Sequence, residues 1–218
     1  MNSPIIQLLV LAGIAIFLIL RLRNVLGTRE GFEKPAAPEQ TARASRPDLE
    51  VIEGGPDRDI TDHVIEDSPQ AQAFAEMKRV EPSFSVTEFV QGARGAYEMI
   101  VMGFEHGELD NLQPLLSEDV FDSFVEVVAA REDQGLQIES EFVGVRETAI
   151  RDVEFHKDTN LAEITMRFIG ELTSVVRDAD GKIIEGSSSA IKRQKDTWTF
   201  ARVMGASDPN WRLVATDA

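Results

Sequence analysis

Apolar residues form one long uninterrupted run near the start of the chain. The run from Ile5 to Leu20 contains sixteen residues and no charge. As a helix it spans about 24 Å, somewhat less than the ~30 Å hydrocarbon core of a bilayer, and the long side chain of Arg21 extends its reach. The pattern predicts a transmembrane anchor within residues 1–27. A cleaved signal peptide is the alternative, but no basic residue precedes the run and no small-x-small site follows it.

Basic residues lie on only one side of this apolar run. Arg21, Arg23 and Arg29 follow it, and no Lys or Arg precedes it. Because basic flanks are retained in the cytoplasm, we expect the N-terminus to lie outside and the rest of the chain to lie in the cytoplasm. The apolar helix itself would contact membrane lipid.

Residues 28–67 carry no sustained helical or alternating period. Their composition, rich in Pro, Gly, Ala and charge, favours a disordered acidic linker. A flexible coil of that length spans roughly 35 Å root-mean-square, so it would tether the following domain near the membrane. The apolar residues within it, such as Val51, Ile52, Val64 and Ile65, are either solvated linker or short docking motifs.

A helical period begins at residue 68, where the folded domain of residues 68–218 is expected to start. Ser68 followed by Pro69 predicts a short helix that ends before residue 82. Ser85 and Glu88 form a capping box, and the apolar residues after it recur at spacings of three and four as far as Gly107. The second helix is therefore long and amphipathic.

A third helix is capped by Ser117 and ends at Gly135, after which the period changes from helical to alternating. Asp180 and Gly181 predict a hairpin turn, and Gly170 predicts a bulge or bend in the longest strand. The expected strands cover residues 136–145, 153–156, 164–176 and 198–203. Helices followed by a bent antiparallel sheet are typical of the α+β class, with the helices packed on one sheet face.

Two sets of residues in this domain match a known family. The first follows the predicted long helix and consists of aromatic and small residues: Phe84, Phe89, Gly92, Ala93, Ala96, Tyr97 and Ile100. The second consists of two C-terminal stretches, WTFAR from Trp198 and DPNWRLVAT from Asp208. With both sets, residues 68–218 resemble the Tim44-like domain, which is named after an import subunit of the mitochondrial inner membrane.

The resemblance implies a fold related to nuclear transport factor two, an α+β cone with a hydrophobic pocket. It also implies association with an inner membrane and with translocation machinery. A short anchored chain is similar to the bacterial branch of the family, which implies a bacterial inner membrane, with a periplasmic N-terminus and a cytoplasmic C-terminal domain. The mitochondrial relatives carry a long charged region in place of the anchor and linker, so recruitment of their chaperone is not implied.

Charge and composition exclude several classes of function. The formal charge of −16 would repel a phosphate backbone, so no nucleic-acid partner is expected. The chain has no cysteine, and His63 and His156 share no ligand spacing, so no metal site is expected. Because the known nucleotide-binding and catalytic motifs are absent, no cofactor is expected either.

Four residues lie opposite the apolar stripe of the long helix when it is turned at about 100° per residue: Gly92, Gly95, Met99 and Met102. Methionines beside glycines form an adaptable apolar surface that another backbone can approach closely. This strip is the predicted partner surface. Alternatively, the preceding helix covers it, with Phe74 against the methionines.

The hydrophobic pocket that the family implies would be lined by aromatic side chains: Tyr97, Phe104, Phe168, Trp198 and Trp211. Cone folds also host isomerases, in which a hydrogen-bond donor and a base converge in such a pocket. Tyr97 would then be the donor, and Asp110 or His106 the base. The simpler interpretation is that Tyr97 is a core aromatic residue whose hydroxyl has one partner.

A small basic island of Lys192, Arg193 and Lys195 interrupts the acidic domain. It is either a solvated strand face or a contact for lipid headgroups or an acidic partner. The sequence as a whole predicts a membrane-anchored adaptor that binds inner-membrane or translocating proteins, rather than an enzyme. The alternative is a pocket that binds a lipid or a small apolar ligand.

Overall fold

The structure is a computed structural model that describes residues 55–217. The predicted anchor, residues 1–27, and the greater part of the predicted linker lie outside this range. Between residues 55 and 217, no helix is both long enough and apolar enough to cross a membrane.

The three predicted helices are present at the predicted places. They are α3 (Pro69–Val80), α4 (Val86–His106) and α5 (Glu118–Asp133). Each begins at its expected serine cap: the Oγ atoms of Ser68, Ser85 and Ser117 accept amides three residues later, at 3.1, 3.2 and 3.4 Å. Gly107 ends α4 in the left-handed conformation, with φ of 73°. Two short 3-10 turns, η1 (Leu109–Asn111) and η2 (Gln113–Leu115), join α4 to α5.

The sheet has four antiparallel strands in the order β1-β2-β3-β4. They are β1 (Gln137–His156), β2 (Leu161–Arg177), β3 (Ile183–Val203) and β4 (Arg212–Asp217). The two strands predicted at 136–145 and 153–156 are one strand, because three bulges in β1 interrupt the alternation without ending the pairing to β2. The predicted hairpin turn is confirmed, with Gly181 at φ of 77°.

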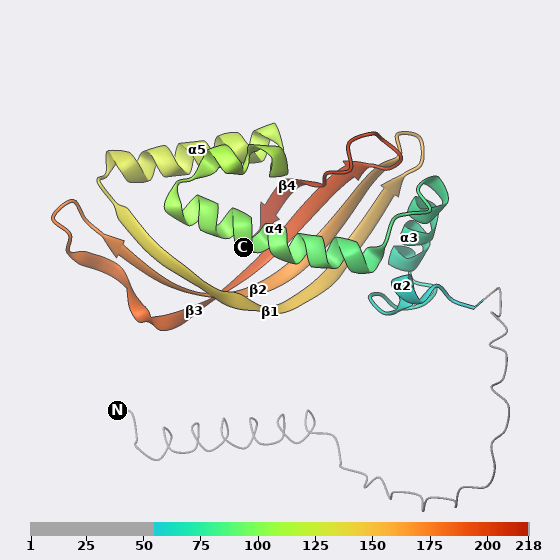
Figure 1. The fold of residues 1–218 in the computed structure, drawn as a ribbon, viewed down its shortest axis with the longest axis horizontal. Helices are drawn as coiled ribbons and strands as arrows, with labels where there is room; N and C mark the ends of the chain where they lie inside the picture. The colour runs from blue at the N-terminus through green and yellow to red at the C-terminus, as the bar shows by residue number, and fades with distance from the viewer. Residues whose placement is uncertain (1–54, 218) are drawn as a thin grey trace, which may run out of the picture. The chain divides into compact units, whose positions relative to one another are not determined.

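Helix α4 crosses the concave side of the bent sheet, and α5 runs beside it (Figure 1). Every second residue of β2 from Ala162 to Leu172 is buried, so one face of the strand packs under α4. From the helix, the side chains of Tyr97 and Ile100 are fully buried against that face. Helices on one face of an antiparallel sheet confirm the α+β class.

Gly170 does not form the bulge that is one of the two predicted possibilities. The bulge at this level of the sheet lies in the neighbouring strand, between Val145 and Glu147, and the pairing of Gly170 itself is regular. A Cβ atom on Gly170 would lie 2.6 Å from the hydroxyl oxygen of Tyr97. Glycine is therefore needed here because α4 presses a tyrosine onto the strand backbone.

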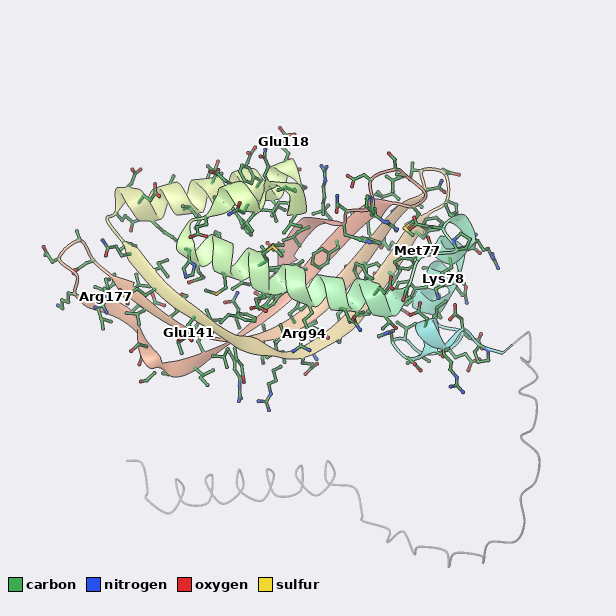
Figure 2. The ribbon with its side chains drawn as sticks, in the orientation of Figure 1. Met77, Lys78, Arg94, Glu118, Glu141 and Arg177 are labelled. Carbon is green, nitrogen blue, oxygen red and sulfur yellow. The ribbon has the colours of Figure 1, made fainter. Side chains whose placement is uncertain are left out.

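The predicted linker extends too far toward the C-terminus. A short helix, α2 (Arg58–Thr61), lies inside it, and Ile60 is only 6% exposed. Asp57 and Asp59 each form an ion pair with Lys78 of α3 at 2.7 Å. Lys78 is labelled in Figure 2. The local sequence is polar and has no helical period, so its order comes from contacts with distant residues, which composition does not reveal.

Candidate functional site

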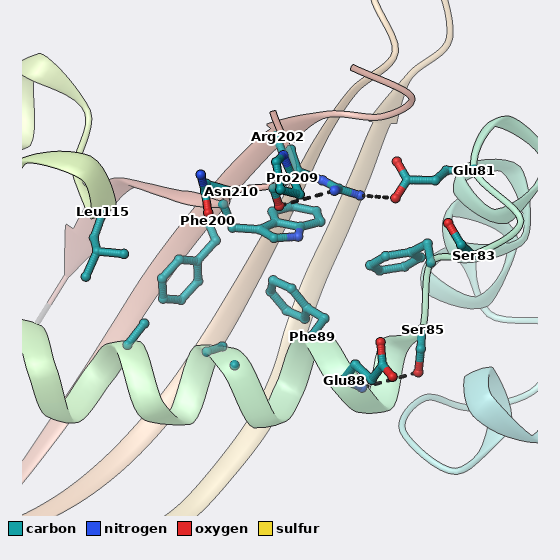
Figure 3. A pocket seen from close by; sticks show the side chains of 15 residues that line it. Glu81, Ser83, Ser85, Glu88, Phe89, Leu115, Phe200, Arg202, Pro209 and Asn210 are labelled. Carbon is teal, nitrogen blue, oxygen red and sulfur yellow. Dashed lines mark hydrogen bonds and ion pairs between the residues drawn. The ribbon is translucent and has the colours of Figure 1, made fainter. Parts of the chain in front are cut away.

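A pocket of about 350 Å³ lies between the first half of α4 and the end of the sheet where β3 and β4 meet (Figure 3). The turn between α3 and α4 closes one side of it. Its lining combines aromatic side chains with several polar ones. The residues that define it are Phe84, Phe89, Ala93, Phe200, Arg202 and Trp211.

Aromatic rings form the wall of this aromatic pocket. The ring centroids of Phe89 and Trp211 lie 4.7 Å apart, and those of Phe89 and Phe200 lie 6.1 Å apart, both with edge-to-face geometry. Phe84 lies 6.0 Å from Trp211 and extends the wall toward α3. Such a wall binds an apolar group through contact area and supplies no reactive atom.

An ion pair forms the polar end of the aromatic pocket. Arg202 donates to Glu81 at 2.8 Å and to the carbonyl of Pro209 at 3.2 Å, and its guanidinium lies 5.2 Å from the ring of Trp211. Burial alone would raise the pKa of Glu81. Hydrogen bonds from the Gly205 amide and the Arg202 guanidinium lower it by more, so the pKa of Glu81 lies below its usual value. The Glu81 carboxylate is therefore charged at neutral pH. Arg202 also keeps a buried Nε without a partner among residues 55–217.

Tyr97 is a core residue, and its hydroxyl donates to Asp196 at 2.5 Å. Burial, and then the Asp196 carboxylate, raise the pKa of Tyr97 far above its usual value, so the phenol stays protonated. The second oxygen of Asp196 accepts from Gln194 at 3.2 Å. Sequence reasoning did not identify Asp196. The available signal was an acidic residue at an inward position of the strand pattern, two residues before Trp198.

The five residues predicted to line one pocket do not lie around one cavity. Tyr97, Phe168 and Trp198 pack on one another in the core, with centroid distances of 4.5 and 4.7 Å from the tyrosine ring. Trp211 lines the aromatic pocket. Phe104 lies at the other end of α4, where it joins Trp198 in a smaller hollow of about 260 Å³.

The residues considered for acid–base chemistry also lie apart. His106 is exposed, and its Nε2 lies 3.1 Å from the carbonyl oxygen of Ser140. Asp110 lies in η1 and is exposed. Neither residue lines the aromatic pocket.

The structure brings His156 to two carboxylates that the sequence did not connect. Its Nε2 lies 3.1 Å from Glu163 and 3.8 Å from Glu154, across the first pair of strands. Glu154 and His156 are exposed and Glu163 is half-buried, and their ligand atoms lie within 4.8 Å of one another, an arrangement that exposed acidic groups commonly form without a metal ion.

The predicted partner surface is exposed in part. Met99 is 53% exposed, and with Met102 and Gly95 it borders a shallow methionine groove of about 420 Å³ whose floor includes Leu112. Gly92 instead opens onto the aromatic pocket. The alternative in which α3 covers the strip is wrong, because Phe74 is buried elsewhere, stacked on Phe84 at 6.2 Å.

Comparison with known proteins gives this architecture a family. Residues 70–218 match the Tim44-like domain. The chain belongs to the Tim44-like domain family. The resemblance inferred from the helix and C-terminal residues is thereby confirmed.

Two curated relatives of this Tim44-like chain are named as import subunits. Subunit TIM44-1 of the mitochondrial import inner membrane translocase of Arabidopsis thaliana is 21% identical over 72% of this chain and 34% of its own length. Subunit TIM44 of the same translocase of Homo sapiens is 22% identical over 73% of this chain and 36% of its own length. The chain thus spans about a third of each relative.

Among solved structures, the intermembrane space region of the chloroplast protein ARC6 superposes on this Tim44-like chain with a TM-score of 0.41. The sequence identity is 12%, and the match covers 59% of this chain and 94% of the ARC6 chain.

Proposed function

We propose that this Tim44-like protein is a membrane-anchored adaptor that binds other polypeptides at the cytoplasmic face of a bacterial inner membrane, in the handling of preproteins or membrane proteins. The observation that carries the proposal is the family membership of residues 70–218, together with relatives that are named as subunits of an inner-membrane translocase. The apolar run of residues 5–20 would supply the anchor.

The methionine groove supports a binding role. An exposed apolar side chain such as Met99 gains contact area when a partner covers it, and the flexible thioether adapts to partners of different shape. Gly95 leaves open space where a side chain would otherwise stand, since a Cβ atom there would meet nothing within 4 Å. We therefore assign protein binding to this groove.

Two pairs of substitutions test this assignment. Met99→Glu with Met102→Glu should abolish copurification of membrane or translocating proteins while the melting temperature of the chain changes little, because Met99 is 53% exposed and Met102 is only half-buried. The matched control is Val125→Glu with Val127→Glu on α5, which are 41% and 43% exposed. Equal copurification by both variants and wild type would contradict the proposal.

A second candidate function is supported by the aromatic pocket. Its aromatic wall and the Arg202–Glu81 pair suit a ligand with an apolar body and one polar end, such as a lipid or a small apolar molecule. Of the two carboxylates in its lining, Glu81 is held by Arg202 and Gly205 with a lowered pKa, which makes it a poor base, and Glu88 is exposed, so binding fits better than isomerisation.

Two glycines on the same helix separate the two candidate functions. A Cβ atom at Gly92 or at Gly95 would meet nothing within 4 Å, so a side chain can leave the helix at either position without a backbone clash. Gly92→Leu fills the aromatic pocket and should remove any ligand seen by native mass spectrometry of the full chain. Gly95→Leu fills the methionine groove instead and should reduce copurification alone. An adaptor that uses no pocket ligand would be unaffected by Gly92→Leu.

The proposed topology has its own test, because the chain has no cysteine. Ser188→Cys on the exposed part of β3 gives a single thiol. It should react with a membrane-impermeant reagent only after the inner membrane is opened. Reaction in cells whose outer membrane alone is permeabilised would contradict the cytoplasmic assignment.

A further inference from the structure

Strand β3 is paired on both sides only along its last third. It pairs with β2 over most of its length, but β4 covers it only from Thr197 to Ala201. From Lys192 to Asp196 the outer edge of β3 therefore has no strand beside it among the described residues. Before Lys192, residues 188–191 form a bulge in β3 opposite the single residue Thr173 of β2. The free edge therefore begins after this bulge. An open edge displays backbone amides and carbonyls that a further strand can bind.

A hollow adjoins the free edge on the concave side of the sheet. It has a volume of about 260 Å³, and its lining combines α4, α5, β3 and the end of β4. Phe104 and Phe124 face each other there with ring centroids 4.5 Å apart, and Gln194 belongs to the strand side. A strand that continued the line of β4 would carry one side chain into this hollow.

The free edge is positively charged on a strongly acidic protein. Lys192 pairs in register with the inward residue Leu172, so its side chain lies on the concave face, whereas Lys195 pairs with Ile169 on the convex face. Neither lysine forms an ion pair with any residue between 55 and 217. Arg193 between them is held by Glu171 at 2.8 Å. The acids that line the hollow are Glu105, Asp217 and Asp196, and the Asp196 carboxylate is already bound by Tyr97 and Gln194.

We propose that the free edge of β3 binds an extended acidic segment of a partner protein as an added strand. The alternation of a strand fixes the pattern of that segment. The added strand runs in the direction of β4. Its first residue is acidic and faces Lys195, and its second is apolar, lies beside Gln194 and enters the hollow. Its third residue faces Arg193, and its fourth is acidic and faces Lys192. The recognised sequence is therefore acidic, apolar, any, acidic.

Charge argues for a partner rather than a second copy of this chain. Two copies that paired antiparallel about Gln194 would place Lys195 of each opposite Arg193 of the other, and like charges oppose such pairing. An acidic strand meets the opposite charge on both faces. This inference rests on the proposed adaptor function but uses a different surface from the methionine groove.

The test uses the purified full chain and a short fluorescent peptide with a Glu-Leu-Thr-Glu core, followed by fluorescence anisotropy. Lys192→Glu with Lys195→Glu should weaken binding about tenfold and should favour a peptide with Lys in place of Glu. Arg58→Glu with Arg151→Glu changes the net charge equally at exposed positions elsewhere and should have little effect. N-methylation of alternate peptide amides should abolish binding in one of the two registers only, because a strand directs every second amide to its neighbour.

Three results would overturn the added strand. They are no binding by the wild type, equal weakening by both charge variants, and equal loss from both N-methylation registers. Concentration-dependent dimerisation that the Lys192 and Lys195 changes abolish would instead assign the edge to a second copy. Failure here is distinguishable from failure of the adaptor function, because partners that bind the methionine groove would still copurify with the edge variant.

Discussion

The carboxylate of Asp59 in α2 accepts the backbone amide of Val86, the first residue of α4, at 2.8 Å. Its other oxygen accepts the amide of Thr87 and the hydroxyl of Ser85, both at 2.9 Å. The first amides of a helix have no partner within the helix and carry partial positive charge, so a carboxylate there is stabilising. The N-terminus of α4 is thus capped twice, once by Ser85 and once by a residue far away in the sequence.

Asp59→Asn should lower the free energy of unfolding by about 1–2 kcal/mol at neutral pH, because the charge at the helix end and its pair with Lys78 are lost. Chemical denaturation of the full chain measures this change. Asp62→Asn is the matched control, since Asp62 is exposed in the same segment and forms no ion pair with the described residues. An equal loss from both changes would contradict the capping role.

The same carboxylate predicts how stability depends on pH. Burial raises the pKa of Asp59, but the Lys78 ammonium and the amides of Thr87 and Val86 outweigh it and hold that pKa well below its usual range. Because the folded pKa is lower than the unfolded one, this stabilisation is complete above about pH 4 and is lost as the pH falls further. The difference in free energy of unfolding between wild type and Asp59→Asn should therefore become smaller below pH 4.

The boundary of the folded domain can be tested with two fragments. A fragment of residues 55–218 keeps α2 with Ile60 and Asp59, whereas one of residues 68–218 loses both the double cap and the contact with Lys78. We expect the shorter fragment to melt at a temperature several degrees lower, since roughly 1–2 kcal/mol shifts the midpoint of a domain of this size by that amount. Equal melting temperatures would mean that α2 contributes nothing to stability.

The buried pair of Tyr97 and Asp196 should be essential for stability. Tyr97→Phe leaves one oxygen of a buried carboxylate without its donor, and we expect a loss of about 2–3 kcal/mol. In the double variant Tyr97→Phe with Asp196→Asn, a neutral amide replaces the unpaired carboxylate and should recover part of that loss. Denaturant titration of the wild type, the two single variants and the double variant measures the coupling. Additive losses would show that the two side chains do not interact.

Gly170 should be intolerant of any side chain as long as Tyr97 is present. Gly170→Ala places a Cβ atom 2.6 Å from the tyrosine hydroxyl and 2.9 Å from its ring, and the overlap should cost about 1–3 kcal/mol. Removal of the hydroxyl in Tyr97→Phe relieves the closer of these contacts. The double variant should consequently lose less stability than the sum of the single variants, as a double-mutant cycle would show.

Local signals in the sequence were sufficient for α3, α4 and α5 and for part of the sheet. Ser68, Ser85 and Ser117 are capping residues whose partners lie three residues away, so short-range pattern locates α3, α4 and α5. Alternation likewise located β1 and β2, although three bulges made β1 read as two pieces. In β3 it located only residues 198–203, and β4 was not among the predicted strands.

Features that depend on distant residues were not predicted. The order of α2 comes from Ser85, Val86 and Thr87, more than twenty residues away. The pocket assignment was wrong for a related reason: periodicity shows that Tyr97 and Trp198 face inward, but not whether inward aromatic rings border a cavity or fill it. In this fold they stack on one another, and the open space lies beside Trp211 at the end of the sheet.

The central claim, that this Tim44-like protein binds other polypeptides at an inner membrane, is tested most directly by site-specific photocrosslinking in intact cells with pulse-labelled protein synthesis. A photoreactive residue at Met99 should crosslink to newly made membrane or exported proteins, and Gly95→Leu in the same chain should reduce those products. The control position is Ile65, which is 82% exposed and lies in a different part of the domain. No crosslinks to labelled chains at Met99, or the same products from Met99 and Ile65, would contradict the account.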